Sequence, residues 1–497
     1  MTSTEALKYL KEKDKYITTL SHIDGILGWD METVMPQKAE EERGEQMSLL
    51  AVLMHEAKNG EKVKEAVYSI DTATLSDADM ALVREWKRDI EFSSKTPSRL
   101  VKEMSEATAA AHGRWLEARE KNDYSIFKPA LKRIIDLNRE YASCIGDGSY
   151  DTLLDLYERG MTSEKIDSLF NPLEESIHSI MDRLEGKSVD TSFLTQHYDA
   201  KKEEEFCNYV ARKMGFDLKR GAIGVVAHPF TTTLGSDDVR ISNRFTDESV
   251  TDPIFSIVHE TGHALYEMHA SLNSEIRGTS LAQGTSMGIH ESQSRFWENM
   301  MGHSHEFWEY FYPSLQTYMP QLASVRLDDF VLALNFPRPS AIRVNADELT
   351  YTLHIILRYR LEKALIGGSL SVDDVPEAWN RASEEIIRYK VKSDSEGCLQ
   401  DSHWAGGSFG YFPTYALGNL YSAMFLDSLN SDCGRENVRN ALKTGNFDLI
   451  TSWQDRNIWH WGAVYEPAVL VERVCGKPLT AGPFTQYLEE KFTRLYL

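Results

Sequence analysis

Apolar residues recur three and four positions apart along most of this chain, with charged residues between them. The spacing is clearest over residues 100–118, 126–137 and 166–184. Because one face of an α-helix repeats at this period, the pattern predicts amphipathic helices over most of the sequence. We therefore expect a mainly α protein.

Residues 221–245, GAIGVVAHPFTTTLGSDDVRISNRF, do not follow the helical period. Short β-branched runs flank Gly235, Ser236, Asp237 and Asp238, a composition that favours strands joined by a turn. The stretch predicts a small antiparallel β-sheet near residues 221–245.

A further helix is predicted over residues 253–270, where Asp252 can cap the first turn and Pro253 fits the first helical position. This segment is apolar nearly all round, through Ile254, Ile257, Val258, Leu265 and Met268. It nevertheless contains His259, Glu260 and His263, which are costly to bury without partners.

The HExxH spacing of these three residues suits a metal ion. Histidines four apart share a helix face, and Glu260, about 100° away, can position a water molecule without being a ligand. The alternative is a pair of hydrogen-bonded core histidines. Gly262 between them permits a close backbone approach or simple helix packing.

A catalytic zinc site needs a third protein ligand and an open position for water. The segment SMGIHESQSRFWENMM, residues 286–301, has an apolar stripe from which Glu291 points away. Glu291 is a candidate ligand, or it lies on a solvated face and pairs with Arg295 at i+4. The adjacent His290 has the same two interpretations.

The chain has 497 residues, of which 42% are hydrophobic and 26% are charged, a composition typical of a large folded protein. A formal net charge of −22 opposes binding to nucleic acid or to anionic lipid, and no apolar stretch is long enough to cross a membrane. The polar N-terminus lacks a secretory h-region, and five scattered cysteines suggest no disulfide framework. We expect a cytoplasmic location.

No repeat or long linker interrupts the chain, so residues 1–497 are interpreted as one helical domain, with two lobes on either side of a deep groove.

Several further motifs occur in a fixed order along the chain. They are AHPF (227–230), DDVRIS (237–242), HETGH (259–263), HESQSR (290–295), IRVNADELTY (342–351) and GCLQDSHW (397–404). Together they resemble the signature series of the carboxypeptidase Taq family of metallocarboxypeptidases. GWDMETVMP, YDTLLDLYERGMT and GYFPTYALGN extend the resemblance over nearly the whole chain. Ser242 stands where the family usually has threonine.

The resemblance implies a helical fold around a long cleft, a cytoplasmic homodimer, and one Zn²⁺ per subunit for which Co²⁺ can substitute. It implies release of single C-terminal amino acids from peptides, with broad side-chain tolerance. Transferred to this chain, the metal ligands are His259, His263 and Glu291, and the general base is Glu260.

Peptide hydrolysis needs an activated water, and here Glu260 is expected to accept its proton and pass it to the leaving amine. Charge on the carbonyl oxygen needs extra donors, for which His403 with Tyr411 or Tyr415 are the candidates. Either tyrosine could instead pack in the core.

An exopeptidase of this kind must recognise peptide substrates by their free C-terminal carboxylate. Arg343 is the candidate, because guanidinium binds carboxylates in bidentate fashion; its alternative is an i,i+4 pair with Asp347. His228 and Arg240 lie on the predicted sheet, where an edge strand could align the peptide.

Two other functions fit the same residues. A related helical HExxH oligoendopeptidase or dipeptidyl-releasing peptidase would share the metal chemistry and differ in carboxylate recognition. A noncatalytic helical peptide-binding protein with a structural metal is the alternative of another class; Glu260 and the missing fourth protein ligand argue against it.

Overall fold

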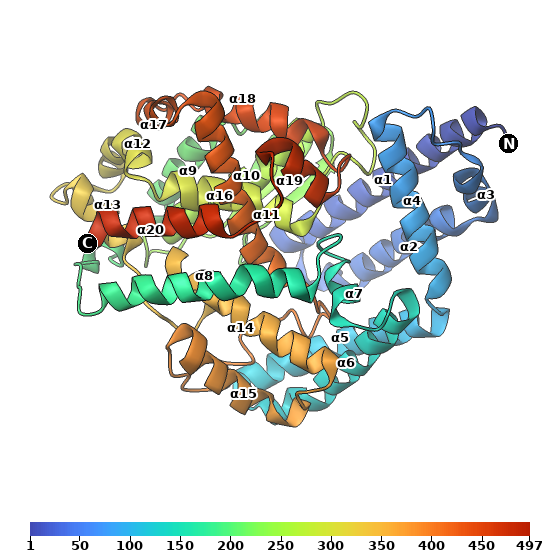
Figure 1. Cartoon of the computed structure of the whole chain (residues 1–497), viewed down its shortest axis with the longest axis horizontal. Coiled ribbons are helices and arrows are strands. Elements are labelled where there is room, and N and C mark those ends of the chain that lie inside the picture. Colours follow the sequence, from blue (N-terminus) through green and yellow to red (C-terminus); the bar gives the residue numbers. More distant parts are fainter. The chain divides into compact units, whose positions relative to one another are not determined.

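α-Helices form most of the computed structural model, which describes residues 1–497 (Figure 1). The three predicted amphipathic helices are present with wider bounds, as α5 (Ser98–Lys121), α6 (Tyr124–Ile145) and α8 (Ser163–Leu184). The mainly α prediction is confirmed. None of the helices combines the length and apolar character that a membrane span requires.

The chain forms two compact units, each assembled from three segments. Unit 1 contains Met1–Ile90, Val189–Leu334 and Tyr421–Pro478; unit 2 contains Glu91–Ser188, Asn335–Leu420 and Leu479–Leu497. Three of the boundaries fall inside helices, within α4 (Asp77–Lys95) and α16 (Pro413–Cys433) and before the last residue of α13 (Leu327–Asn335). The interpretation as one domain with two lobes stays a prediction.

Unit 1 contains the N-terminal helices, the sheet and most helices of the middle and C-terminal segments. Besides α4 and part of α16, its helices are α1 (Ser3–Thr33), α2 (Glu40–Asn59), α3 (Glu61–Ser69), α9 (Ala200–Met214), α10 (Asp252–Ala270), α11 (Met287–Arg295), α12 (His305–Tyr318), α13 (Leu327–Asn335), α17 (Arg435–Thr444), α18 (Asp448–Asn457) and α19 (Pro467–Cys475). A π-helical segment, η3 (Phe296–Gly302), continues α11.

The sheet has three strands, β1 (Gly221–Val225), β2 (Thr231–Gly235) and β3 (Asp238–Asn243), in the order β1-β3-β2. Strands β2 and β3 form the predicted antiparallel hairpin, but β1 pairs with β3 in parallel. The wholly antiparallel prediction is therefore wrong for β1. The loop 226–230 reverses the chain, and β3 then enters between β1 and β2, so it runs in the same direction as β1.

Helix α10 begins one residue earlier than predicted and ends at Ala270, as predicted. Its apolar side chains are buried on several sides, which explains why its polar residues need partners inside the protein. The capping role expected for Asp252 is wrong: the N-cap position is Thr251, and the Ser249 hydroxyl accepts the Asp252 N–H at 3.3 Å.

Unit 2 is helical. Besides α5, α6 and α8, it contains α7 (Tyr150–Leu154), α14 (Glu348–Gly367), α15 (Val375–Ala382) and α20 (Gly482–Tyr496). Its core includes apolar residues of α6, α8 and α14, among them Leu131, Ile134, Phe170, Leu173, Leu353 and Ile356. Helices α8 and α20 lie alongside each other (Figure 1) and are joined by the Arg183–Glu489 ion pair.

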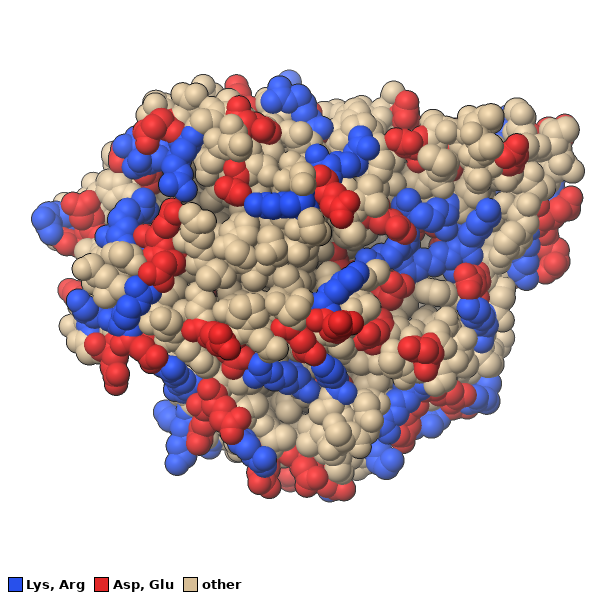
Figure 2. All heavy atoms as spheres, in the orientation of Figure 1, with Lys and Arg blue, Asp and Glu red and all other residues tan.

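Acidic and basic side chains alternate over most of the face in Figure 2, and basic side chains gather in one group right of the centre. All five cysteines are free, as expected for a chain without a disulfide framework.

Candidate metal centre

Helices α10 and α11 pack closely enough for their backbones to touch. A Cβ added at Gly262 would lie 2.6 Å from the Gln293 carbonyl oxygen and 2.7 Å from the Ser294 Cα. Of the two interpretations of Gly262, the structure supports the close backbone approach. This packing places Glu291 of α11 opposite His259 and His263 of α10.

Glu291 Oε2 faces both imidazoles. It lies 3.6 Å from His259 Nε2 and 3.4 Å from His263 Nε2, and donor atoms of all three residues lie within 4.8 Å of one another. Donors arranged tetrahedrally about zinc at its usual bond lengths are separated by roughly 3.3–3.5 Å. The two nitrogen–oxygen separations are close to this spacing, and two imidazoles with a carboxylate are a donor set that suits a divalent metal ion.

The other oxygen of Glu291 is held by its own helix. Arg295 Nε donates to Glu291 Oε1 at 2.7 Å, so the predicted i+4 pair is present as well. Glu291 is buried, however, so the solvated face considered as its alternative is wrong. Burial alone would raise the Glu291 pKa, but Arg295 and His259 outweigh it and hold the pKa well below its ordinary value.

Glu298 of η3 contacts His259 from the side opposite Glu291. His259 Nδ1 lies 2.8 Å from Glu298 Oε2, and Arg295 Nη1 donates to the same oxygen at 3.2 Å. Burial would lower the pKa of His259, but Glu291 and Glu298 raise it to about 9. His263, by contrast, has its pKa lowered to about 3 by burial and by His290.

Glu260 lies on the same helix, and its carboxylate meets the sheet. The Thr231 hydroxyl of β2 donates to Glu260 Oε2 at 2.6 Å. Burial raises the Glu260 pKa, while His259 and the Thr231 hydrogen bond oppose the rise. Glu260 is thus a buried carboxyl group with one specific donor and a position next to the candidate ligands.

His290 does not join the group of candidate ligands. Its Nε2 lies 2.8 Å from Glu267 Oε1, and its ring stacks on His263 with centroids 4.4 Å apart. Glu267 also accepts the Gly284 N–H at 3.2 Å. Of the two candidates on this helix, Glu291 is the one that faces both histidines of α10.

Unit 2 contains the cluster around Arg343, which begins a short 3-10 turn (Arg343–Asn345). Arg343 Nε and Nη2 donate to Asp401 Oδ1 at 3.0 and 2.9 Å, and Arg358 Nε donates to Oδ2 at 2.7 Å. The i,i+4 pair with Asp347 is wrong, because Asp347 caps α14 by accepting the Thr350 N–H.

Aromatic residues of the same cluster surround the guanidinium. Arg343 lies 4.9 Å from the ring centre of Tyr415, and Tyr415 Oη lies 3.1 Å from His403 Nε2. Burial and the two arginines lower the His403 pKa to about 4, against the effect of Asp401. Tyr411 packs beside Tyr415 with ring centroids 5.3 Å apart.

His228 and Arg240 belong to the region of the three-stranded sheet. His228 is exposed on the loop between β1 and β2. Arg240 of β3 is paired with Asp238, through Nε and Nη2 at 2.8 Å each, and its guanidinium lies 5.6 Å from the ring centre of Trp29. Their contact with substrate stays a prediction.

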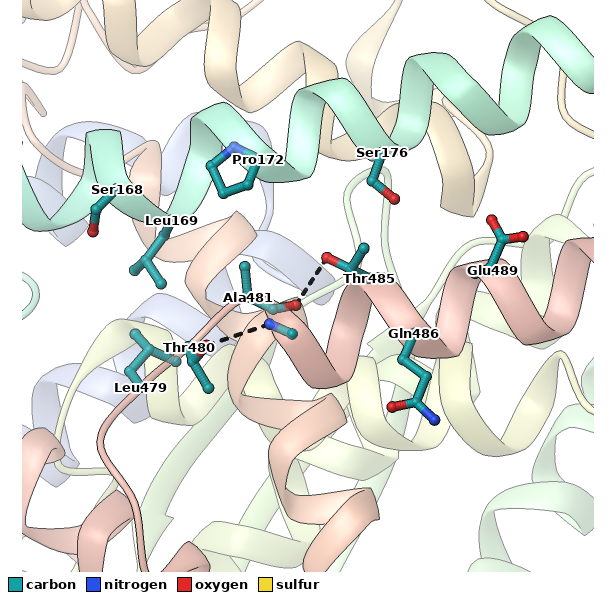
Figure 3. Close-up of a pocket in the computed structure, with 11 residues that line it drawn as sticks. Ser168, Leu169, Pro172, Ser176, Leu479, Thr480, Ala481, Thr485, Gln486 and Glu489 are labelled. Carbon is teal, nitrogen blue, oxygen red and sulfur yellow. Dashed lines mark hydrogen bonds between the residues drawn. The ribbon is translucent and has the colours of Figure 1, made fainter.

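A separate hollow of about 660 Å³ lies in unit 2 between α8 and the start of α20 (Figure 3). Its lining contains no histidine, cysteine or basic side chain, and its one carboxylate, Glu489, is paired with Arg183. The hollow therefore offers no donor set comparable to that of the metal centre.

Comparison with known proteins agrees with this geometry. The model of the carboxypeptidase Taq (M32) metallopeptidase family matches residues 9–492. The chain belongs to this family. Thermostable carboxypeptidase 1 of Thermus thermophilus is 39% identical over 100% of both chains, and carboxypeptidase 1 of Bacillus subtilis is 36% identical over 98% of this chain and 99% of that protein.

The crystal structure of the M32 carboxypeptidase from Deinococcus radiodurans R1 has a TM-score of 0.95 and 33% identity, covering 99% of each chain. The protein is therefore a metal-dependent carboxypeptidase, a hydrolase of peptide bonds, and its family implies a divalent metal and peptide substrates.

Several residues that complete these clusters were not predicted from sequence, namely Thr231, Glu298, Arg358, Asp401 and Tyr351, whose hydroxyl accepts from Arg343 Nη1 at 3.1 Å. Glu298 had a usable signal, since it follows Glu291 by seven residues and so falls on the same helix face. Asp401 lies within the motif GCLQDSHW, but neither it nor Thr231 had a local signal that named its partner, which lies 58 and 29 residues away respectively.

Proposed function

We propose that this metallocarboxypeptidase releases single C-terminal amino acids from peptides with broad side-chain tolerance, using a zinc ion held by His259, His263 and Glu291. The observation that supports the ligand set most directly is the convergence of both Nε2 atoms on Glu291 Oε2. When bound, such an ion supplies Lewis acidity, which polarises the scissile carbonyl and lowers the pKa of water to about 7.

Glu260 is the proposed general base. It accepts a proton from the attacking water and delivers it to the nitrogen of the leaving amino acid, so that the C–N bond breaks with a neutral amine leaving. Its burial supports this role, because a raised pKa brings a carboxyl group closer to the pH at which it must exchange protons.

Substitution of the base tests this assignment. Glu260→Gln keeps the size of the side chain and the three proposed ligands but cannot accept the proton. We expect stoichiometric zinc by metal analysis and a kcat lower by about 10²- to 10⁴-fold with a blocked dipeptide. Full activity of a zinc-loaded Glu260→Gln protein would overturn the role of Glu260.

Arg343 is the proposed site for the free C-terminal carboxylate of the substrate. Arg343 and Arg358 share the single carboxylate of Asp401, so this buried cluster keeps an excess positive charge that an anionic group can neutralise. The planar guanidinium suits a carboxylate in geometry as well as charge.

Replacement of Arg343 by alanine is expected to raise KM for peptides with a free C-terminus about tenfold or more, and to affect C-terminally amidated peptides far less. Arg343→Lys keeps the charge but loses the fork, so an intermediate KM is expected. Equal effects on free and amidated peptides would exclude carboxylate recognition by Arg343.

His403 and Tyr415, linked by a hydrogen bond, are the proposed donors to the oxyanion, with Tyr411 as the alternative tyrosine. Neutral His403 suits donation from one ring nitrogen, because its lowered pKa keeps it uncharged at neutral pH. His228 and Arg240 are kept as secondary candidates for peptide alignment along the sheet.

The proposal includes a cytoplasmic homodimer and Co²⁺ as an effective substitute for Zn²⁺, as the family resemblance implies. Analysis of products separates it from the related endopeptidase function. Sequential release of single residues supports a carboxypeptidase of this specificity, whereas internal cuts or dipeptides would contradict it.

A further inference from the structure

The two candidate histidine ligands differ in what their second ring nitrogen meets. His259 Nδ1 lies 2.8 Å from Glu298 Oε2, whereas the buried His263 Nδ1 has no hydrogen-bond partner. The His263 ring is stacked on the His290 ring, with centroids 4.4 Å apart, and meets the His259 ring edge to face at 4.8 Å. At the Nδ1 position, therefore, only His259 has a hydrogen-bond partner that can select its tautomer.

We propose that Glu298 is the positioning residue of the metal centre. By accepting the Nδ1–H of His259, it holds the tautomer in which the Nε2 lone pair is directed toward Glu291 and the ion. The inference rests on the proposed function, because it requires His259 to be a metal ligand.

Arg295 makes this arrangement rigid. Its Nε donates to Glu291 Oε1 at 2.7 Å and its Nη1 donates to Glu298 Oε2 at 3.2 Å. One guanidinium thus fixes the carboxylate that faces the ion and the carboxylate that orients His259. The Glu291 carboxylate is buried and that of Glu298 is 18% exposed, so both have little solvent to offer an alternative partner.

The shape of the helix contributes to the contact. Glu291 and Arg295 lie in α11, and Glu298 lies in the π-helical segment η3 that continues it. π-Helical turns are rare and are found often at functional sites. Here the turn brings Glu298 to His259 while Gly262 keeps α10 close to α11.

The affinity of the metal-free protein for Zn²⁺ tests the proposal independently of activity. Zinc is titrated against a chelator of known affinity, and Glu298→Ala is expected to raise the dissociation constant about 10- to 100-fold. Glu298→Gln, whose amide oxygen can still accept the Nδ1–H, is expected to recover most of the affinity. The visible absorption of the Co²⁺-loaded proteins should change in Glu298→Ala and not in Glu298→Gln.

Glu267 offers a matched control. It is a buried carboxylate that also lies 2.8 Å from a histidine nitrogen, but that histidine, His290, is outside the group of candidate ligands. Glu267→Ala is expected to leave the zinc dissociation constant close to that of the unmodified protein. An equal loss of affinity in the Glu267 and Glu298 variants would indicate a general packing effect and overturn the proposal.

His263→Ala separates this inference from the proposed function. Unchanged zinc affinity in His263→Ala would reject the metal centre itself. Lost affinity in His263→Ala together with unchanged affinity in Glu298→Ala would reject only the positioning role. If Glu298→Ala does not fold, Glu298→Asp replaces it, because the shorter carboxylate withdraws from His259 and the same loss of affinity is expected.

Discussion

At the scale of single residues, each oxygen of the Glu291 carboxylate has its own partner. Oε1 accepts from Arg295, and Oε2 faces His259 and His263. The salt bridge and a position that faces both histidines, which were alternatives when only the sequence was considered, therefore coexist. Arg295 keeps the buried carboxylate ionised and orients it, and both effects favour its use as a ligand.

Thr231 provides a prediction at this scale. Its hydroxyl donates to Glu260 Oε2 at 2.6 Å, and hydrogen bonds to charged groups contribute about 1.5–3 kcal/mol. Thr231→Val preserves the shape but removes the donor, so we expect kcat to fall about tenfold or more with zinc content unchanged.

Thr231→Ser restores the hydroxyl and should return most of the activity lost in Thr231→Val. Steady-state kinetics with a blocked dipeptide, together with metal analysis, measures both variants. A valine variant with normal kcat would show that the hydrogen bond does not position the base.

At the scale of elements, the distance between α10 and α11 sets the geometry of the metal centre. The helices approach through Gly262, and the connection between them is anchored to α1 by Asp14, which accepts the Ser280 N–H and hydroxyl at 2.8 and 2.7 Å. Asp14 also accepts the Trp86 indole N–H of α4 at 3.0 Å. Contacts far from the candidate ligands thus help to place α11.

Gly262→Ala is predicted to weaken zinc binding through this packing. The added methyl would meet backbone atoms at 2.6 and 2.7 Å, which cannot move without shifting α11 and Glu291. We expect destabilisation by about 1–3 kcal/mol and a lower zinc affinity, measured by thermal unfolding and chelator competition.

Gly113 is the matched control for this substitution. It lies in the middle of α5, and an added Cβ would have no neighbour within 4 Å. Gly113→Ala should therefore stabilise the protein by up to about 1 kcal/mol, because alanine favours the helix. If Gly262→Ala behaved like Gly113→Ala, the close approach of α10 and α11 would not matter for the centre.

At the scale of the whole molecule, the proposed functional residues belong to two units, and unit 2 has a buried anchor of its own. Glu362 of α14 accepts hydrogen bonds from the Tyr150 hydroxyl at 2.7 Å, the Trp404 indole at 2.9 Å and the Gly410 N–H at 3.0 Å. These bonds hold both ends of the loop 404–410, which lies between His403 and Tyr411. Burial, against these donors, raises the Glu362 pKa to about 7.

This pKa predicts a pH dependence of stability. The unfolded chain loses the Glu362 proton near 4.5, whereas the folded protein keeps it until about 7. The folded state therefore binds more protons between these values, and stability falls as pH rises through that window, by at most about 3 kcal/mol from this group.

Glu362→Gln cannot ionise and should lack this contribution. In metal-free protein, the unfolding midpoint of the variant relative to the unmodified chain is expected to be higher at pH 8 than at pH 5. A difference that stays constant or changes in the opposite direction would show that Glu362 is ionised throughout.

The helices, the histidine pair and the family of this protein could be predicted from its sequence alone. These predictable features depend on residues close in the chain. They are the helical periodicity, the placement of His259 and His263 on one face of α10, and each of the short motifs of the family. They could be predicted because the period of a helix is a local property of the backbone.

Only the tertiary structure decided the partners of the polar side chains. Thr231 and Glu260 are 29 residues apart, His259 and Glu298 are 39 apart, and Arg343 and Asp401 are 58 apart. The parallel pairing of β1 and the burial of Glu291 likewise depend on which elements pack together. Such contacts arise from the packing of whole helices and strands, and no local pattern specifies which distant donor a buried carboxylate will meet.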